Sequence, residues 1–216
     1  MRKMRLENMI HHPPHSPAES QATNAGLEQM LAAPSPWVVR WSGLADAQAS
    51  VLDVACGSGR HVRWFLERGH RVTGVDRDTA AAHGAVPDAD LVQADIEKAP
   101  WPLVDPTTSA VREFGVVVVT NYLWRPLFPV LVSSVASGGV LIYETFSAGQ
   151  ETVGRPSRAV FLLQPGELLQ VCSDFRIVAY EEGVLTGPER YVQRIAAIRK
   201  GPVKPADHPA QRHLLS

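Results

Sequence analysis

Short apolar runs alternate along the chain with segments whose apolar residues recur at helical spacing. Four of these runs have the length and the β-branched composition of buried strands, and they cover 51–55, 71–75, 91–94 and 115–120. The last run, GVVVVT, is apolar at successive positions, which is typical of a central strand in a sheet covered on both faces. Further strands are predicted at 140–146, 175–181 and 190–198.

Helical patterns separate the predicted strands. In 59–69 the apolar residues Val62, Phe65 and Leu66 lie on one helical face, and Gly69 is placed to end the helix. Weaker patterns predict helices at 79–86, 126–136 and 165–172. Repeated strand–helix–strand units predict a doubly wound α/β fold with a mostly parallel sheet and helices on both faces. The last two strands follow each other directly, so one of them should be antiparallel.

The two ends of the chain differ from the middle. Residues 1–17 contain a His–Pro cluster and 201–216 is also rich in Pro and His, so both are expected to be disordered tails. A metal site in the His–Pro cluster is the weaker alternative, because the prolines prevent a common helical face. Residues 18–33 have helix-forming composition, and 18–200 is the expected single domain. The aromatic segment 37–41 either caps the ligand pocket or packs in the core.

Composition narrows the class of protein. The 216 residues include 21 basic and 22 acidic side chains and 45% hydrophobic residues, which disfavours nonspecific nucleic-acid binding. Two cysteines make neither a disulfide framework nor a zinc site, and no metal site is predicted in the domain. Apolar runs fall short of the roughly 20 residues of a membrane helix, and no secretory signal is recognisable. A cytoplasmic location is expected, without membrane insertion; the oligomeric state is not indicated.

The loop after the first strand, DVACGSG, holds the first candidate site residues. Gly57 and Gly59 allow a tight turn and the close approach of a ligand. A dinucleotide site would need glycine where Val62 stands, and the Gly-Lys-Ser/Thr of a phosphate-binding loop is absent. Asp53, ahead of the glycines, would repel a pyrophosphate and attract a cation. A nicotinamide-dependent dehydrogenase is therefore disfavoured.

Two further carboxylates follow the next strands, at the edge where an open sheet binds its ligands. Asp76 can accept hydrogen bonds from both hydroxyls of a ribose, and Asp95 from an exocyclic amine such as that of adenine. Either residue alone also suits a helix cap or a solvated loop. Together with Asp53 they indicate a cationic ligand with a ribose diol and an aminopurine but no phosphate. S-adenosylmethionine has these features.

The runs VLDVACGSGRHVRWFLERGHRVTGVDRD, LVQADIEKAPWPL and FGVVVVTNYLWRP resemble successive motifs of the class I S-adenosylmethionine-dependent methyltransferases, and the resemblance covers about 36–200. The segment from YETF to QPGEL is similar to small bacterial members near the tellurite-resistance and ubiquinone-type groups. The resemblance implies a Rossmann-like, seven-stranded sheet with an antiparallel final strand. Ala55 stands where the family has glycine. The cofactor contacts implied are Asp53, Ala55, Gly57, Gly59, Asp76, Arg77, Asp95, Ile96 and Asn121.

The predicted activity is in-line methyl transfer to a small-molecule acceptor, of the EC 2.1.1 type. Tyr122, Trp124 and Arg125 follow the fourth strand and are candidate walls of the acceptor pocket, although Trp124 also suits packing under the following helix. Arg155 and Arg158 are candidates for binding an anionic acceptor, although loop arginines are usually solvated. The acceptor itself is not predicted.

Catalysis of this kind needs mainly positioning, so no general base is assigned. Tyr122, Tyr143 and Glu144 are the candidates to test if a base exists, and a buried Glu144 would need a partner. Arg60 or His61, at the start of the first helix, either contacts the cofactor carboxylate or is solvated.

Two further alternatives complete the hypothesis. A noncatalytic cofactor-binding or scaffold protein would keep the same fold. A nucleic-acid methyltransferase is disfavoured, because NYLW follows the fourth strand where adenine-modifying enzymes have Asn/Asp-Pro-Pro-aromatic. Cys56 is interpreted as packing beside the cofactor rather than as a nucleophile, and Cys172 as a core residue.

Overall fold

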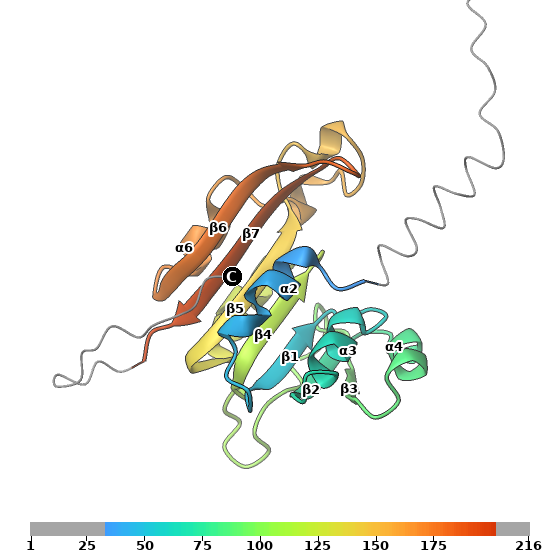
Figure 1. Cartoon of the computed structure of the whole chain (residues 1–216), viewed down its shortest axis with the longest axis vertical. Helices are drawn as coiled ribbons and strands as arrows, with labels where there is room; N and C mark the ends of the chain where they lie inside the picture. The colour runs from blue at the N-terminus through green and yellow to red at the C-terminus, as the bar shows by residue number, and fades with distance from the viewer. Residues whose placement is uncertain (1–32, 202–216) are drawn as a thin grey trace, which may run out of the picture. The chain divides into compact units, whose positions relative to one another are not determined.

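A seven-stranded mixed sheet organises residues 33–201, the part of the chain that the computed structural model describes (Figure 1). The strand order is β3-β2-β1-β4-β5-β7-β6. The first five strands pair in parallel, and β7 runs antiparallel to both β5 and β6. The strands are β1 (Ser50–Val54), β2 (Arg71–Asp76), β3 (Asp90–Gln93), β4 (Phe114–Thr120), β5 (Val135–Phe146), β6 (Phe175–Leu185) and β7 (Arg190–Arg199). The predicted α/β fold and its antiparallel final strand are confirmed.

Short helices cover both faces of the sheet. The helices are α2 (Pro36–Trp41), α3 (Arg60–Leu66), α4 (Ala80–Ala85), α5 (Phe128–Ser133) and α6 (Glu167–Val171), with 3-10 turns η1 (Ser42–Leu44), η2 (Arg125–Leu127), η3 (Gln150–Thr152) and η4 (Ala159–Phe161). One core contains side chains of α2, α3 and α4, and the other contains side chains of η2, α5 and α6. Successive β4 residues Val116–Val119 are fully buried because they alternate between these two cores.

The helix α2 packs on the sheet. Ser35 caps it by accepting a hydrogen bond from the Trp37 N–H, and a proline occupies its first turn. Trp37, Val38 and Trp41 are buried, and the indole N–H of Trp37 donates to the carbonyl of Ile195 at 3.2 Å. Of the two interpretations of segment 37–41, core packing fits these contacts.

The predicted helix 126–136 is only partly correct. The chain enters it through η2, α5 ends at Ser133, and Val135 already belongs to β5. Phe114 pairs with Val135, and its N–H donates to the carbonyl of Ser134 at 2.8 Å, which draws this segment into the sheet. The glycines at 138 and 139 therefore lie within β5, beside a register shift, rather than in a turn before it. An apolar, valine-rich run suits a helix and a strand equally well, so the periodicity did not separate them.

The predicted tails at 1–17 and 201–216 and the predicted helix at 18–33 lie outside the described residues, apart from Ala33 and Gly201. The domain boundaries drawn from these segments stay predictions.

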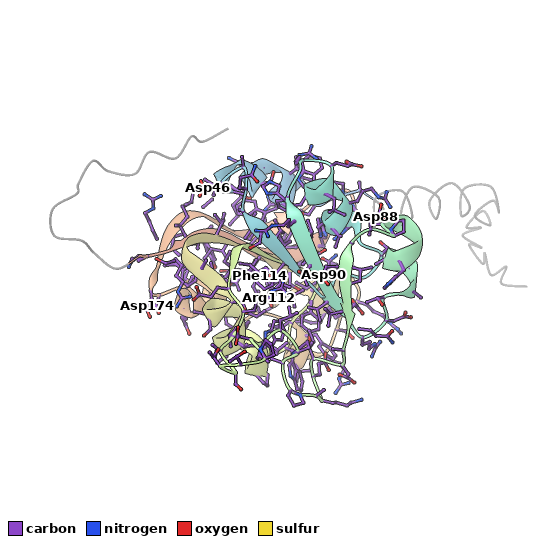
Figure 2. All side chains as sticks on the ribbon, turned by 90° about the horizontal axis from the view of Figure 1, so that it is seen from below. Asp46, Asp88, Asp90, Arg112, Phe114 and Asp174 are labelled. Carbon is purple, nitrogen blue, oxygen red and sulfur yellow. The ribbon has the colours of Figure 1, made fainter. Side chains whose placement is uncertain are left out.

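The two edges of the sheet carry different polar groups. We call the starts of the strands the amino edge, which Figure 2 shows with Asp90, Arg112 and Phe114 labelled. There the guanidinium of Arg112 lies 3.7 Å from the Asp90 carboxylate and above the Phe114 ring. We call the segments that follow β1 to β4 the carboxyl edge, and it comprises 55–59, 76–78, 94–98 and 121–122.

Candidate functional site

The loop between β1 and α3 takes an unusual backbone conformation. Ala55, Gly57 and Gly59 have φ values of 55°, 55° and 76°. This left-handed region is open to glycine and costs about 1–2 kcal/mol for other residues, so the conformation of Ala55 lowers the stability of the fold. A Cβ on Gly57 would meet nothing within 4 Å, whereas one on Gly59 would lie 3.2 Å from a Val86 methyl. Gly57 therefore faces open space.

Asp76 ties this loop to the end of β2. One carboxylate oxygen accepts the Gly57 N–H at 2.9 Å, and the other accepts the Asp78 N–H at 3.0 Å. Each oxygen has a second lone pair that remains for a ligand. Asp76 thus fixes the glycine loop and presents an acceptor beside it.

A cavity of about 290 Å³ opens at the carboxyl edge. Asp76 and Asp95 both line it, so the structure brings these two predicted residues together. Of the other predicted cofactor contacts, Ala55, Arg77 and Ile96 also line it, as does Tyr122, which was predicted for the acceptor. Sequence reasoning missed Glu97 and Lys98, which complete the lining two and three residues after Asp95. Their position on the same short loop was the available signal.

Four predicted cofactor contacts do not line this cavity: Asp53, Gly57, Gly59 and Asn121. Asn121 is exposed after β4 with φ of 54°, and its N–H donates to the carbonyl of Glu144. Asp53 is the important difference. It precedes the end of β1 and its side chain is only 1% exposed, so the three acidic residues do not share one open hollow.

Asp53 is buried on the face of the sheet that α3 covers. Its Oδ2 atom has no hydrogen-bond partner among the described residues. Burial raises the pKa of the Asp53 carboxyl to about 7, and the nearby Arg60 guanidinium opposes that shift. An unsatisfied buried carboxyl oxygen costs stability unless a ligand or water bonds to it.

Of the two alternatives for His61, a contact with the cofactor carboxylate or a solvated helical turn, the structure excludes the solvated one. Its side chain is buried, and its Nε2 atom accepts the backbone N–H of Ser35 at 3.1 Å. Burial, and then the positive charge of Arg60, lowers the pKa of His61 to about 3, so the imidazole is neutral. Its Nδ1 atom lies 3.9 Å from Oδ2 of Asp53. The hydrogen bond between Ser35 and His61 links residues 26 positions apart, and no local sequence pattern indicates it.

The candidates on β5 face opposite sides of the sheet, as alternation requires. Glu144 is buried and has the expected partners, since it accepts from the Ser35 hydroxyl at 2.9 Å and from Arg194 at 3.2 Å. Tyr143 is buried in the other core and donates its hydroxyl to the carbonyl of Tyr122 at 2.9 Å, and burial raises its pKa. Neither side chain lines the cavity, so of the three catalytic candidates only Tyr122 does. Burial, and then the Glu97 carboxylate, raises the pKa of Tyr122.

Of the residues predicted to bind the methyl acceptor, most do not line the cavity. Arg125 binds both carboxylate oxygens of Glu167, at 2.7 and 2.8 Å, and two backbone carbonyls of the segment around η4. Neither Arg125 nor Trp124 lines the cavity. Arg155 and Arg158 are exposed on the loop after β5, and the Arg158 guanidinium lies over the Phe161 ring. Their role in acceptor binding stays a prediction.

Both cysteines are buried thiols. Burial raises the pKa of Cys56 and of Cys172 to about 12, which opposes thiolate formation. The interpretation of both as packing residues fits these surroundings. Within 33–201 no group of three or more His, Cys, Asp or Glu side chains is arranged to hold a metal ion, and no helix there is long and apolar enough to span a membrane.

Comparison with known proteins shows what this chain is similar to. Residues 51–139, which contain the glycine loop, Asp76 and the cavity lining, match a family model described as a methyltransferase domain. The matched segment is similar to a methyltransferase domain, and the sheet has the Rossmann-like arrangement of the solved methyltransferases described below. The resemblance drawn from the sequence motifs is thereby confirmed. No curated protein sequence matches the chain.

Solved structures agree on the fold. TehB from Haemophilus influenzae aligns with a TM-score of 0.57 and 18% identity over 71% of this chain and 58% of TehB, so the chain spans less than two thirds of that protein. A TehB-like S-adenosylmethionine-dependent methyltransferase from Corynebacterium glutamicum aligns with a TM-score of 0.56 and 19% identity, over 86% of this chain and 100% of that chain. The 1,6-didemethyltoxoflavin-N1-methyltransferase of Burkholderia thailandensis was solved with S-adenosylhomocysteine. It aligns with a TM-score of 0.50 and 15% identity, over 88% of this chain and 93% of that chain.

Proposed function

We propose that this protein is an S-adenosylmethionine-dependent methyltransferase that methylates a small-molecule acceptor by in-line displacement. The observation that carries the proposal is the cavity lined by Asp76 and Asp95, with Asp76 hydrogen-bonded to the glycine loop. The methyltransferase domain and its class I fold support the choice of cofactor. The toxoflavin-type neighbour acts on a small molecule, and we extend that class of acceptor to this chain.

The cavity fits the nucleoside end of the cofactor. Its volume of about 290 Å³ lies at the lower end of ligand sites, which span about 300–1,000 Å³. Asp76 would accept the ribose hydroxyls and Asp95 the adenine amine, while Ile96 and Tyr122 supply apolar walls. Asp53, buried and with one unsatisfied oxygen, fits the cationic methionine end.

When bound, the cofactor supplies an activated methyl group on a positively charged sulfur, which is a good leaving group. The protein's task is then to hold the acceptor in line with that methyl group and to exclude water, and positioning alone can account for several kcal/mol. Asp76 contributes by fixing both the loop and the ribose.

The described residues favour an acceptor that is already nucleophilic. Because its pKa is raised, Tyr122 keeps its proton at neutral pH and can donate a hydrogen bond but cannot serve as a general base. The hydroxyl of Tyr143 already donates to a backbone carbonyl, and Arg194 balances the charge of Glu144. A thiolate or another anion needs no base, so we expect acceptors of this kind to react best.

Calorimetric titration with S-adenosylhomocysteine, followed by methyl transfer assays on a panel of thiols, phenols, amines and metalloid anions, tests the proposal. We expect one cofactor site and transfer to at least one class of anionic acceptor. Absence of binding at millimolar ligand would contradict the whole proposal.

A noncatalytic cofactor-binding protein is the second candidate, and one observation favours it. A neighbour of this fold, with a TM-score of 0.54 and 15% identity, is the [4+2]-cyclase SpnF, so the fold also occurs in a protein named for another reaction. Tight binding of S-adenosylhomocysteine without transfer to any acceptor in the panel would support this second candidate.

A further inference from the structure

We propose that Asp53, His61 and Ser35 form a buried positioning unit that couples cofactor binding to the release of one proton. In this unit Asp53 takes the positive charge of the cofactor's methionine end as a carboxylate. The inference rests on the proposed function, since it assigns a partner to the Asp53 oxygen that has none among the described residues. The proton lost from the Asp53 carboxyl group goes to solvent.

Ser35 determines which nitrogen of His61 carries the proton. The Ser35 N–H donates to Nε2 at 3.1 Å, so Nε2 must present a lone pair. A neutral imidazole with an acceptor at Nε2 carries its hydrogen on Nδ1, the atom 3.9 Å from Oδ2 of Asp53. Protonation of Nε2 would place its N–H opposite the Ser35 N–H, leaving two donors without an acceptor between them. The backbone of Ser35 therefore keeps His61 neutral and turns an N–H towards the carboxyl group.

The contact distance gives His61 a positioning role. At 3.9 Å the Nδ1–H and Oδ2 are too far apart for a hydrogen bond, yet the dipole favours the ionised form of Asp53. Ser35 is held in place from a second side, because its hydroxyl donates to Glu144 at 2.9 Å. Glu144 is in turn paired with Arg194. The orientation of His61 is thus fixed by buried contacts that do not depend on a ligand.

Other groups around Asp53 shift the pKa of its carboxyl group in opposite directions. Arg60 of α3 and the Val62 N–H favour the carboxylate, whereas burial and the charge of Asp76 at the end of β2 oppose it. The buried Cys56 thiol, also near Asp53, stays protonated because its own pKa is raised. With a pKa of about 7, the free protein holds Asp53 as a mixture of both forms near neutrality.

A cationic ligand shifts this mixture. Binding of an ammonium or sulfonium beside Asp53 requires the carboxylate, so the protonated fraction must ionise first. Well below pH 7 the affinity should fall about tenfold per pH unit and binding should release close to one proton, whereas at pH 7 it should release about half a proton.

Calorimetric titration with S-adenosylhomocysteine, which retains the amino group, tests this coupling between pH 5.5 and 8.5 in two buffers of different ionisation enthalpy. We expect the tenfold slope below pH 7 and proton release, both abolished in Asp53→Asn. Binding that is independent of pH, with no proton release, would overturn this inference and leave the methyltransferase proposal standing. Absence of binding at every pH would overturn both.

Two substitutions of His61 separate positioning from packing. The Nδ2 amide of Asn can take the place of the Nδ1–H, so His61→Asn should keep the pH midpoint within a few tenths of a unit of the wild type. His61→Gln can offer an oxygen to the Ser35 N–H but no donor to Asp53, so its midpoint should rise by about one unit. His70→Gln is the control, since His70 is a half-buried histidine bonded to the Ala49 carbonyl. Equal midpoints in all three variants would refute the role of His61.

A matched pair at Ser35 tests the backbone N–H. Its φ of −56° suits proline, so Ser35→Pro removes the N–H, while Ser35→Ala removes only the hydroxyl. Both variants lose the α2 cap and the bond to Glu144, and thermal unfolding measures that shared loss. We expect only Ser35→Pro to change the pH midpoint. The same midpoint in both variants would contradict the assignment.

Discussion

The two edges of the sheet differ in whether their polar side chains have hydrogen-bond partners. At the amino edge, Asp90 accepts from the Thr73 hydroxyl at 2.8 Å, and Arg112 donates to the same hydroxyl at 3.1 Å. Near the carboxyl edge, Asp53 keeps an oxygen with no described partner, and Ala55 and Asn121 adopt positive φ. Satisfied groups stabilise a fold, whereas strained and unsatisfied ones cost stability and persist where a ligand uses them. The unpartnered Asp53 oxygen, rather than backbone strain, distinguishes the carboxyl edge, because Ser109 in the loop before β4 also has a positive φ.

The largest expected effect is on cofactor affinity, when an aspartate at each edge is replaced by alanine. Asp76→Ala removes a carboxylate that orders the glycine loop and would bind the ribose, so S-adenosylhomocysteine affinity should fall about 10–100-fold, as expected for loss of about 1.5–3 kcal/mol of charged hydrogen bonds. Asp46→Ala, an exposed aspartate at the amino edge (Figure 2), is the control. Equal affinities of the two variants would contradict the assignment of Asp76.

The next comparison uses three glycines with positive φ. Gly57→Ala and Gly69→Ala place a Cβ in open space, so each should lower the free energy of unfolding by about 1–2 kcal/mol. Gly59→Ala should cost more, because its Cβ would lie 3.2 and 3.3 Å from Val86 and Ala82 side-chain atoms. Only Gly57→Ala should weaken cofactor binding more than it weakens the fold. Denaturant unfolding and calorimetry measure the two effects, and a loss of affinity in Gly69→Ala would remove the distinction.

A third prediction concerns the free energy of unfolding, which the buried Asp53 carboxylate lowers when it is ionised. Its folded-state pKa of about 7 exceeds the ordinary value of 3.8, so the folded protein holds a proton that the unfolded chain releases between these values. The contribution of Asp53 to stability therefore falls as pH rises from about 4 to 7 and stays low above that. Asp53→Asn should raise the free energy of unfolding by about 1–3 kcal/mol at pH 8 and by less at pH 5. Urea unfolding at both pH values measures this, and an equal change at both would contradict it.

The smallest effect is expected at the amino edge. Arg112 and Asp90 have side chains 47% and 57% exposed, and exposed pairs of this kind contribute about 0–1 kcal/mol. Arg112→Ala should therefore lower the free energy of unfolding by about 1 kcal/mol or less and leave S-adenosylhomocysteine affinity unchanged. A clear loss of affinity would show that the two edges are not independent.

The sequence predicted the parts of the molecule that local patterns determine. Strands such as 115–120 were recognisable because valines at successive positions must be buried on both faces, and Asp76 and Asp95 because they follow such strands. The segment 130–136 was ambiguous, since pairing of Phe114 with Val135 decides its conformation. Long-range contacts of this kind are not encoded in local periodicity.

The same limit applies at the site. The sequence places Asp53 ahead of the glycines, but only the packing of α3 shows that its side chain is buried, and burial of His61 depends on Ser35 from a distant segment. Tyr143 and Glu144 were recognised as alternating, while their partners, the Tyr122 carbonyl and Arg194, belong to other strands and loops. Residue types indicated the chemistry, and only the packing showed which groups remain available to a ligand.

A crystal structure of the protein with S-adenosylhomocysteine tests the central claim most directly. The account predicts the adenosine in the cavity, with the ribose hydroxyls on Asp76, the adenine amine on Asp95, and the amino group of the ligand on the side of Asp53. Adenosine bound elsewhere, with Asp76 bonded only to Gly57 and Asp78, would contradict it.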